Sequence, residues 1–192
     1  MEYQHADKVT GKIVVVSNTG PLISAFQSGR IDLLRRYFSA IYIPESVLIE
    51  LQAHGAGNFV QQLIAEELLV VEAIGPEEST KVEQLARQIA ASARVKDHAG
   101  HQAEAEAIVL MSRMTGEATQ LLLEEKAARK IAQSLQIPLT GFVGILLQAC
   151  HDAVLTAEEM RAALLMCRQQ GTHYGESLIA ETFRRCKEVR RK

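Results

Sequence analysis

The 192-residue chain contains no tryptophan, and aromatic residues make up only 5% of it. We therefore expect an interior of Leu, Ile, Val and Ala rather than stacked rings. Long apolar runs are also missing, since none approaches the ~18 residues that a helix needs to cross a bilayer. The first dozen residues lack the apolar core of a signal peptide. These absences predict a soluble, cytoplasmic protein with no membrane contact.

Neither charge sign dominates, and cysteine is scarce. The chain has 21 Lys and Arg against 23 Asp and Glu, a formal net charge of -2. No global positive field attracts nucleic acid, so any polyanionic partner must use a local patch. The three cysteines, Cys150, Cys167 and Cys186, lie far apart without a CxxC pair. This pattern argues against a disulfide framework or a zinc site and fits a reducing cytosol.

Hydrophobic residues make up 47% of the chain, which is ample for a core, and the length suits one domain. Short apolar runs alternate with segments of helical length, which is typical of an α/β fold. The runs that suit buried strands are residues 13–16, 40–43, 68–73, 120–123 and 137–139. The clearest helices are predicted at residues 45–53, 81–93, 102–114, 142–151, 157–168 and 176–187.

We expect these elements to form a three-layer α/β/α sandwich with a central parallel sheet of about five strands. Residues 1–192 would then be a single domain, with its core at about 12–152 and a C-terminal helical extension at about 153–192. Thr156 followed by Glu159 is a capping-box pattern that predicts the start of the second C-terminal helix.

Polar side chains follow two of the predicted strands. Ser17, Asn18 and Thr19 come directly after the first strand, and Glu124 and Glu125 follow the fourth. In an open parallel sheet, ligands bind beyond the carboxyl ends of the strands, where the strand order reverses. If the order is 3-2-1-4-5, strands one and four are neighbours at that point and the two polar ends meet.

Further acids can join this group from two helices. Glu50 lies late in the helix after the second strand, and Glu104 lies in the first turn of the helix that precedes the fourth strand. Glu106 competes with Glu104, because residues two apart on a helix point in nearly opposite directions. Ile108 and Met111 share the face of Glu104, so we favour Glu104 as the residue that points inward.

A cluster of carboxylates implies a metal ion. Carboxylates in one cleft repel each other unless a cation lies among them, and oxygen ligands select hard ions such as Mg²⁺ or Mn²⁺. One or two such ions can activate a water for in-line cleavage of a phosphodiester, with no protein nucleophile.

Four segments carry a resemblance to a known family. The chain resembles PIN-domain proteins, in particular the VapC-like toxin branch, which opens with a strand and Ser-Asp/Asn-Thr-x-Pro-Leu-Ile. The segments that resemble the branch, in order, are "SNTGPLI", "GRIDLLRRYFSAIYIPESVLIEL", "HQAEAEAIVL" and "LLLEEKAARKIAQSLQIPLTGFVGILLQA". The resemblance covers nearly the whole chain, supports the strand order assumed above, and implies a metal-dependent endoribonuclease.

The resemblance also implies a set of site residues. The expected metal ligands are Asn18, Glu50, Glu104 and Glu124. Glu125 is expected to join them in catalysis. The supporting residues are expected to be Thr19, Glu106 and Arg129.

The chain departs from the branch at several of these positions. Asn18 keeps an oxygen ligand but loses a charge, Glu124 and Glu125 are a methylene longer than the usual aspartates, and Ala103 replaces a glycine. Fewer and more flexible anionic ligands weaken metal binding, because a carbonyl oxygen supplies less field than a carboxylate.

Each expected site residue also has an ordinary structural explanation. Asn18 and Thr19 are common at helix N-caps, and Glu124 and Glu125 suit the first turn of a helix because of its dipole. Arg129 fits a surface ion pair with Glu125. The metal site is therefore predicted from the convergence of several positions and not from any one of them.

The sequence favours the toxin of a toxin–antitoxin pair, a hydrolase that cuts RNA and binds a small antitoxin. The alternatives are a PIN-fold module that binds RNA or protein without cutting, and a Mg²⁺-dependent phosphatase or DNA nuclease. A homodimer is also expected, with residues 31–38 and 63–69 as its apolar surface.

Overall fold

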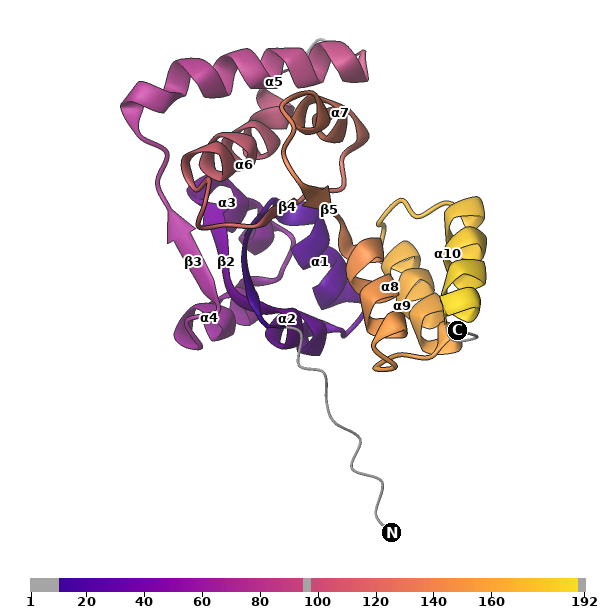
Figure 1. Ribbon diagram of the computed structural model, residues 1–192. Coiled ribbons are helices and arrows are strands. Elements are labelled where there is room, and N and C mark those ends of the chain that lie inside the picture. Colours follow the sequence, from indigo (N-terminus) through magenta and orange to yellow (C-terminus); the bar gives the residue numbers. More distant parts are fainter. Residues whose placement is uncertain (1–10, 95–97, 190–192) are drawn as a thin grey trace.

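The computed structural model describes residues 11–94 and 98–189. Its five strands form one parallel sheet in the order β3-β2-β1-β4-β5, which confirms the predicted order (Figure 1). The strands are β1 (Ile13–Ser17), β2 (Phe38–Pro44), β3 (Leu69–Glu72), β4 (Gln120–Leu122) and β5 (Leu139–Thr140).

The α-helices are α1 (Thr19–Gln27), α2 (Ile31–Tyr37), α3 (Glu45–Ala53), α4 (Gly57–Ala65), α5 (Ser79–Ala93), α6 (Gln102–Arg113), α7 (Lys126–Ser134), α8 (Phe142–His151), α9 (Ala157–Gln169) and α10 (Glu176–Val189). Short 3₁₀ turns, η1 (Pro76–Glu78) and η2 (Ala99–His101), precede α5 and α6. The predicted bounds of α3 and α8 are confirmed, and so is the capping box of Thr156 and Glu159. The predicted fifth strand lies too early, because Pro138 has no N–H to donate to a sheet ladder.

The sheet separates two hydrophobic layers, as the period-two alternation of strands requires. Val15 belongs to a core with α1, α3, α4 and the C-terminal helices, whereas Val16 belongs to a core with α5, α6 and α7. In Figure 1, α5, α6 and α7 lie together on one side, and α8, α9 and α10 stand beside α1. The result is a three-layer α/β/α arrangement.

The C-terminal helices carry a disulfide that the sequence did not predict. Cys150 of α8 is bonded to Cys186 of α10, with Cα atoms 5.7 Å apart, and Cys167 is a buried free thiol. The expectation of no disulfide is therefore wrong. Spacing along the chain misses this pair because α9 turns back and brings α10 against α8.

The apolar stretches expected to form a dimer surface are used inside the molecule. Their buried side chains include Leu33, Leu34, Phe38, Leu63, Leu68 and Leu69. These residues belong to the core around β2, so the expectation that they supply a dimer surface is wrong. Within residues 11–94 and 98–189, no helix is both long and apolar enough to cross a membrane.

Candidate active site at the ends of β1 and β4

The carboxyl ends of β1 and β4 meet, as the strand order predicts. The backbone N–H of Asn18 donates to the carbonyl oxygen of Leu122 at 3.0 Å. Two residues further along each segment, a Cβ atom at Gly20 would lie 3.3 Å from Oε2 of Glu124. The polar residues that follow the two strands are therefore neighbours at one edge of the sheet.

Asn18 occupies the N-cap position of α1 without acting as a side-chain cap. Its backbone is extended and its side chain makes no capping hydrogen bond. The residue is only 4% exposed, and its Oδ1 is a buried acceptor without a hydrogen-bond partner in the described part of the chain. An orphaned buried acceptor costs about 1–3 kcal/mol. Helix capping does not explain this residue, whereas a cation bound to Oδ1 would.

Glu50 reaches the same edge from α3. The hydroxyl of Thr19, the next residue after Asn18, donates to Oε2 of Glu50 across 31 residues of sequence. This contact holds the carboxylate beside the end of β1. Glu50, which its position in the helix alone would place in solvent, is thus held by Thr19 at the end of β1.

Glu104 lies among like charges. Its side chain is 16% exposed, and burial together with the negative charges of Glu50 and Glu125 raises the pKa of its carboxyl group. His101 opposes this effect, with Nδ1 4.0 Å from Oε2 of Glu104. Three carboxylates from three elements therefore share one electrostatic environment.

Glu106 points to different partners. It is 8% exposed, and its carboxylate accepts hydrogen bonds from Ser46 at 2.5 Å and Gln102 at 2.7 Å. Of the two competing glutamates, Glu104 is the one beside Glu50 and Glu125, and Glu106 is satisfied within the fold.

Glu125 and Arg129 have local roles. Glu125 is the N-cap of α7, and its Oε2 accepts from the backbone N–H of Ala128 at 2.5 Å, so the capping explanation holds for it. The Arg129 guanidinium donates to the carbonyl oxygen of Leu123 at 2.6 Å and lies near Glu124 rather than pairing with Glu125. Burial lowers the pKa of Arg129.

Glu124 is held by hydrogen bonds from three parts of the chain. Its Oε1 accepts from the hydroxyl of Tyr174 at 2.5 Å and from the backbone N–H of Phe142 at 3.0 Å. Ser24 donates to Oε2 at the longer distance of 3.4 Å. Burial raises the pKa of Glu124, and these hydrogen bonds oppose the rise. Sequence reasoning missed Ser24 and Tyr174. Ser24 lies within α1, 100 residues from Glu124, and no local pattern signals that the turn between α9 and α10 returns to the end of β4.

The side chains at this site carry the types of oxygen atom that bind a hard divalent cation, but they are not arranged to hold one. Among the described residues, no three His, Cys, Asp or Glu side chains are arranged to hold an ion as they stand. Amide and carboxylate oxygens are nevertheless the ligands that Mg²⁺ and Mn²⁺ take, and the orphaned Oδ1 of Asn18 lacks a partner. Binding of an ion therefore requires some of these side chains to rearrange.

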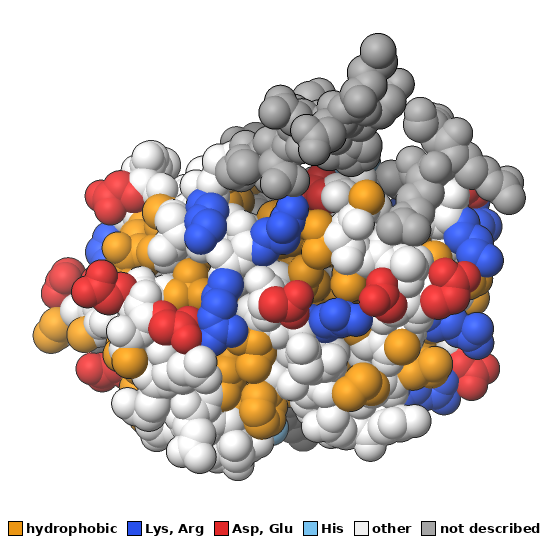
Figure 2. Space-filling view, turned by 90° about the horizontal axis from the view of Figure 1, so that it is seen from below, with side chains coloured by type: hydrophobic (Ala, Val, Ile, Leu, Met, Phe, Trp, Pro, Cys, Tyr) orange, Lys and Arg blue, Asp and Glu red, His pale blue; other side chains and the backbone are white. Residues whose placement is uncertain are grey.

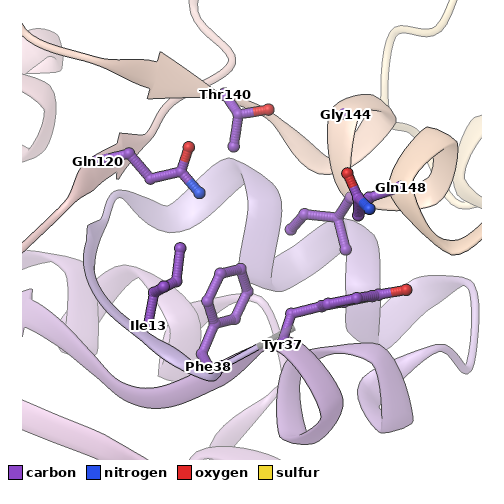
Figure 3. A pocket seen from close by; sticks show the side chains of 9 residues that line it. Ile13, Tyr37, Phe38, Gln120, Thr140, Gly144 and Gln148 are labelled. Carbon is purple, nitrogen blue, oxygen red and sulfur yellow. The ribbon is translucent and has the colours of Figure 1, made fainter. Parts of the chain in front are cut away.

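A cavity lies near the first residues of β1, β2 and β4, away from this site. It has a volume of about 290 Å³, and Figure 3 shows its polar side chains Gln120, Thr140 and Gln148 above an apolar floor. Ile13 and Phe38, the first residues of β1 and β2, belong to that floor. None of its lining residues carries a charge. The cation chemistry therefore belongs at the acidic edge, by which we mean Asn18, Glu50, Glu104, Glu124 and Glu125.

The surface agrees with the balanced composition. On the face shown in Figure 2, acidic and basic side chains are interspersed, and the visible described residues form no continuous basic area. A polyanion would therefore be attracted to this face only weakly.

A family model described as DUF3368, a PIN domain, matches residues 14–188. No curated protein and no solved structure matches the chain significantly. The match runs from β1 to the last turn of α10, so it includes every residue of the acidic edge.

Proposed function

Because the chain belongs to the PIN-domain family, whose members are generally metal-dependent nucleases, we propose that it is a Mg²⁺- or Mn²⁺-dependent endoribonuclease. We propose further that it is the VapC-like toxin of a toxin–antitoxin pair, which acts in the cytoplasm and binds a small antitoxin. A homodimer remains part of this proposal, through a surface other than residues 31–38 and 63–69.

The observation that carries the proposal is the unpartnered buried acceptor of Asn18 at the same sheet edge as Glu104, whose pKa is raised by burial and by the charges of Glu50 and Glu125. Asn18 Oδ1 has no partner in the described chain, and Glu104 lies in the field of Glu50 and Glu125. Both features are costly in a protein without a cation. The same features become favourable when a divalent ion satisfies the acceptor and neutralises the carboxylates.

Each residue then has a distinct task. Asn18, Glu50, Glu104 and Glu124 hold the ion, and Glu125 adds negative charge while it caps α7. The hydroxyl of Thr19 orients Glu50, and Arg129 places positive charge next to Glu124. When bound, the ion supplies a water activated for attack and stabilises charge on the phosphate.

A binding module that does not cut is the second candidate, and Glu124 favours it. This carboxylate is already satisfied by Tyr174, Phe142 and Ser24. Asn18 also supplies one charge fewer than an aspartate. Such a protein would bind RNA or a protein partner without needing a metal.

Cleavage of a mixed single-stranded and structured RNA panel separates the two candidates. We expect wild type to cut in Mn²⁺ and to be inactive in EDTA, and Glu104→Gln to lose at least about 100-fold, as expected for loss of a group that acts in the transition state. Glu83→Gln is the matched control, because Glu83 is an exposed helix residue paired with Arg87. Equal cleavage in EDTA, or full activity of Glu104→Gln, would overturn the proposal of a metal-dependent nuclease at this site. RNA binding without cleavage would support the binding module.

A further inference from the structure

The carboxylate of Glu124 is fixed by donors from three separate parts of the chain. Tyr174, in the turn between α9 and α10, and Phe142, the first residue of α8, both donate to Oε1. Ser24 of α1 lies 3.4 Å from Oε2 and 2.9 Å from the hydroxyl of Tyr174. Oε1 therefore carries one short and one ordinary hydrogen bond, whereas Oε2 has one long contact within the described part of the chain.

Two glycines close around the same side chain. A Cβ at Gly20 would lie 3.3 Å from Oε2 of Glu124, and one at Gly141 would lie 3.3 Å from its Cγ and from the carbonyl oxygen of Leu123. Close packing on both sides prevents the carboxylate from turning over freely. The two oxygens are thus held in unequal environments, with Oε2 facing the start of α1.

The C-terminal hairpin that carries Tyr174 is fastened on both sides of the tyrosine. The Cys150–Cys186 disulfide ties α10 to α8. At the other side, Cys167 of α9 donates its thiol to the carbonyl oxygen of Ser24 at 3.2 Å. Tyr174 itself is only 7% exposed. Its hydroxyl is therefore placed by a rigid support and not by a mobile loop.

We infer that Tyr174 is a positioning residue for the metal site: it occupies Oε1 of Glu124 so that Oε2 is presented to the ion beside Asn18. This inference rests on the proposed function, because it assumes that Glu124 is a metal ligand. Hydrogen bonds to a ligating carboxylate orient it, and their loss typically weakens metal binding about 10- to 100-fold. This role of Tyr174 means that the C-terminal helices help to build the site at the end of β4.

The test is Mn²⁺ affinity measured by calorimetry on the full chain, starting from metal-free protein. We expect Tyr174→Phe to weaken binding by at least about tenfold. Tyr37→Phe is the matched control, because it removes a tyrosine hydroxyl that donates to a carboxylate of Asp152 at 2.8 Å, remote from the acidic edge. The control should bind Mn²⁺ like wild type.

A double-mutant cycle shows whether Tyr174 acts through Glu124. If it does, Tyr174→Phe weakens binding in the wild-type background but has little further effect in Glu124→Gln. Thermal melting of each metal-free variant identifies any that fails to fold, and Ser24→Ala, which removes the other hydroxyl near Glu124, then takes the place of Tyr174→Phe. Equal Mn²⁺ affinity of Tyr174→Phe and Tyr37→Phe would overturn the inference.

The same titrations keep this inference distinct from the proposed function. Wild type that binds Mn²⁺, with binding lost in Glu104→Gln, supports the function whatever Tyr174 does. Wild type that binds no Mn²⁺ overturns both. A full effect of Tyr174→Phe in the Glu124→Gln background overturns the route through Glu124 and leaves the function standing.

Discussion

The backbone N–H of Asn18 donates to the carbonyl oxygen of Leu122 at 3.0 Å, just beyond the paired residues of β1 and β4. This bond extends the ladder to the point where both segments leave the sheet. It places the Asn18 side chain at the switch point of the strand order, where α/β proteins bind their ligands. Asn18, whose buried Oδ1 has no hydrogen-bond partner in the described chain, therefore lies at the edge where the acidic side chains gather.

Asn18→Asp should strengthen metal binding. The substitution adds a charge at a buried oxygen that has no partner, and carboxylates bind hard cations more strongly than amides do. We expect Mn²⁺ to bind about tenfold more tightly, equivalent to about 1.4 kcal/mol. The metal-free variant should melt at a lower temperature, because it buries a charge that has no partner.

Calorimetry and melting curves with and without Mn²⁺ measure both effects. Asn58→Asp is the control, since Asn58 is an exposed residue in the first turn of α4. An Asn18→Asp variant that binds Mn²⁺ no better than wild type would show that Asn18 is not a ligand.

Glu104→Gln and Glu106→Gln should have different effects: the first should affect Mn²⁺ binding, and the second should affect stability. Glu104→Gln removes a carboxyl group whose pKa is raised by burial and by like charges, so the metal-free protein should be at least as stable as wild type while Mn²⁺ binding is lost. Glu106→Gln replaces one of the two oxygens that accept from Ser46 and Gln102 by an NH₂ group, and the lost hydrogen bond should lower the free energy of unfolding by about 1–3 kcal/mol. Its Mn²⁺ affinity should not change.

Urea unfolding in EDTA and Mn²⁺ titration of the two variants provide the comparison. Loss of Mn²⁺ binding in Glu106→Gln with retention in Glu104→Gln would reverse the assignment of the two glutamates.

Local chemistry made much of the fold predictable. The β-branched run of β1 lies between two cores and is buried from both faces. The capping box of Thr156 and Glu159 marks the start of α9 because both partners lie within one turn. In these elements the residues that decide the structure are close together in the sequence.

The unpredicted features depend on contacts between distant segments. Tyr174 meets Glu124 across 50 residues of sequence, and Cys150 meets Cys186 across 36. Both contacts arise from the way α9 and α10 fold back, which periodicity does not encode. Glu125 illustrates the limit within the site, because the same glutamate satisfies the pattern of a helix cap and that of an acidic cluster.

Gly144→Ala should destabilise the protein through a steric clash at the cavity lined by Gln120, Thr140 and Gln148. A Cβ at Gly144 would lie 2.0 Å from Oγ1 of Thr140, and overpacking of this kind costs about 1–3 kcal/mol. In a Thr140→Ala background the clash is absent, and alanine is favoured over glycine inside a helix by about 0.5–1 kcal/mol. The substitution should then stabilise the protein.

Denaturant unfolding of the four proteins in this cycle measures the change of sign. A Gly144→Ala effect that is the same in both backgrounds would rule out Thr140 as the cause.

Counting reactive thiols should reveal the disulfide and the buried state of Cys167. Burial raises the pKa of the Cys167 thiol to about 11, so the folded protein should not react with a thiol reagent at neutral pH. In denaturant without reductant, only Cys167 should react, and after reduction Cys150 and Cys186 should react as well.

The raised pKa of Cys167 also sets a pH dependence. The thiol of a cysteine in an unfolded chain has a pKa of about 8.5. The folded protein therefore binds the thiol proton of Cys167 more tightly than the unfolded chain does. The stability linked to this thiol is complete below about pH 8.5 and is lost as the pH rises toward about 11. Cys167→Ala should therefore remove part of the alkaline fall in melting temperature.

Three reactive thiols in denaturant without reductant would contradict the disulfide, and rapid labelling of the folded protein at neutral pH would contradict the burial of Cys167.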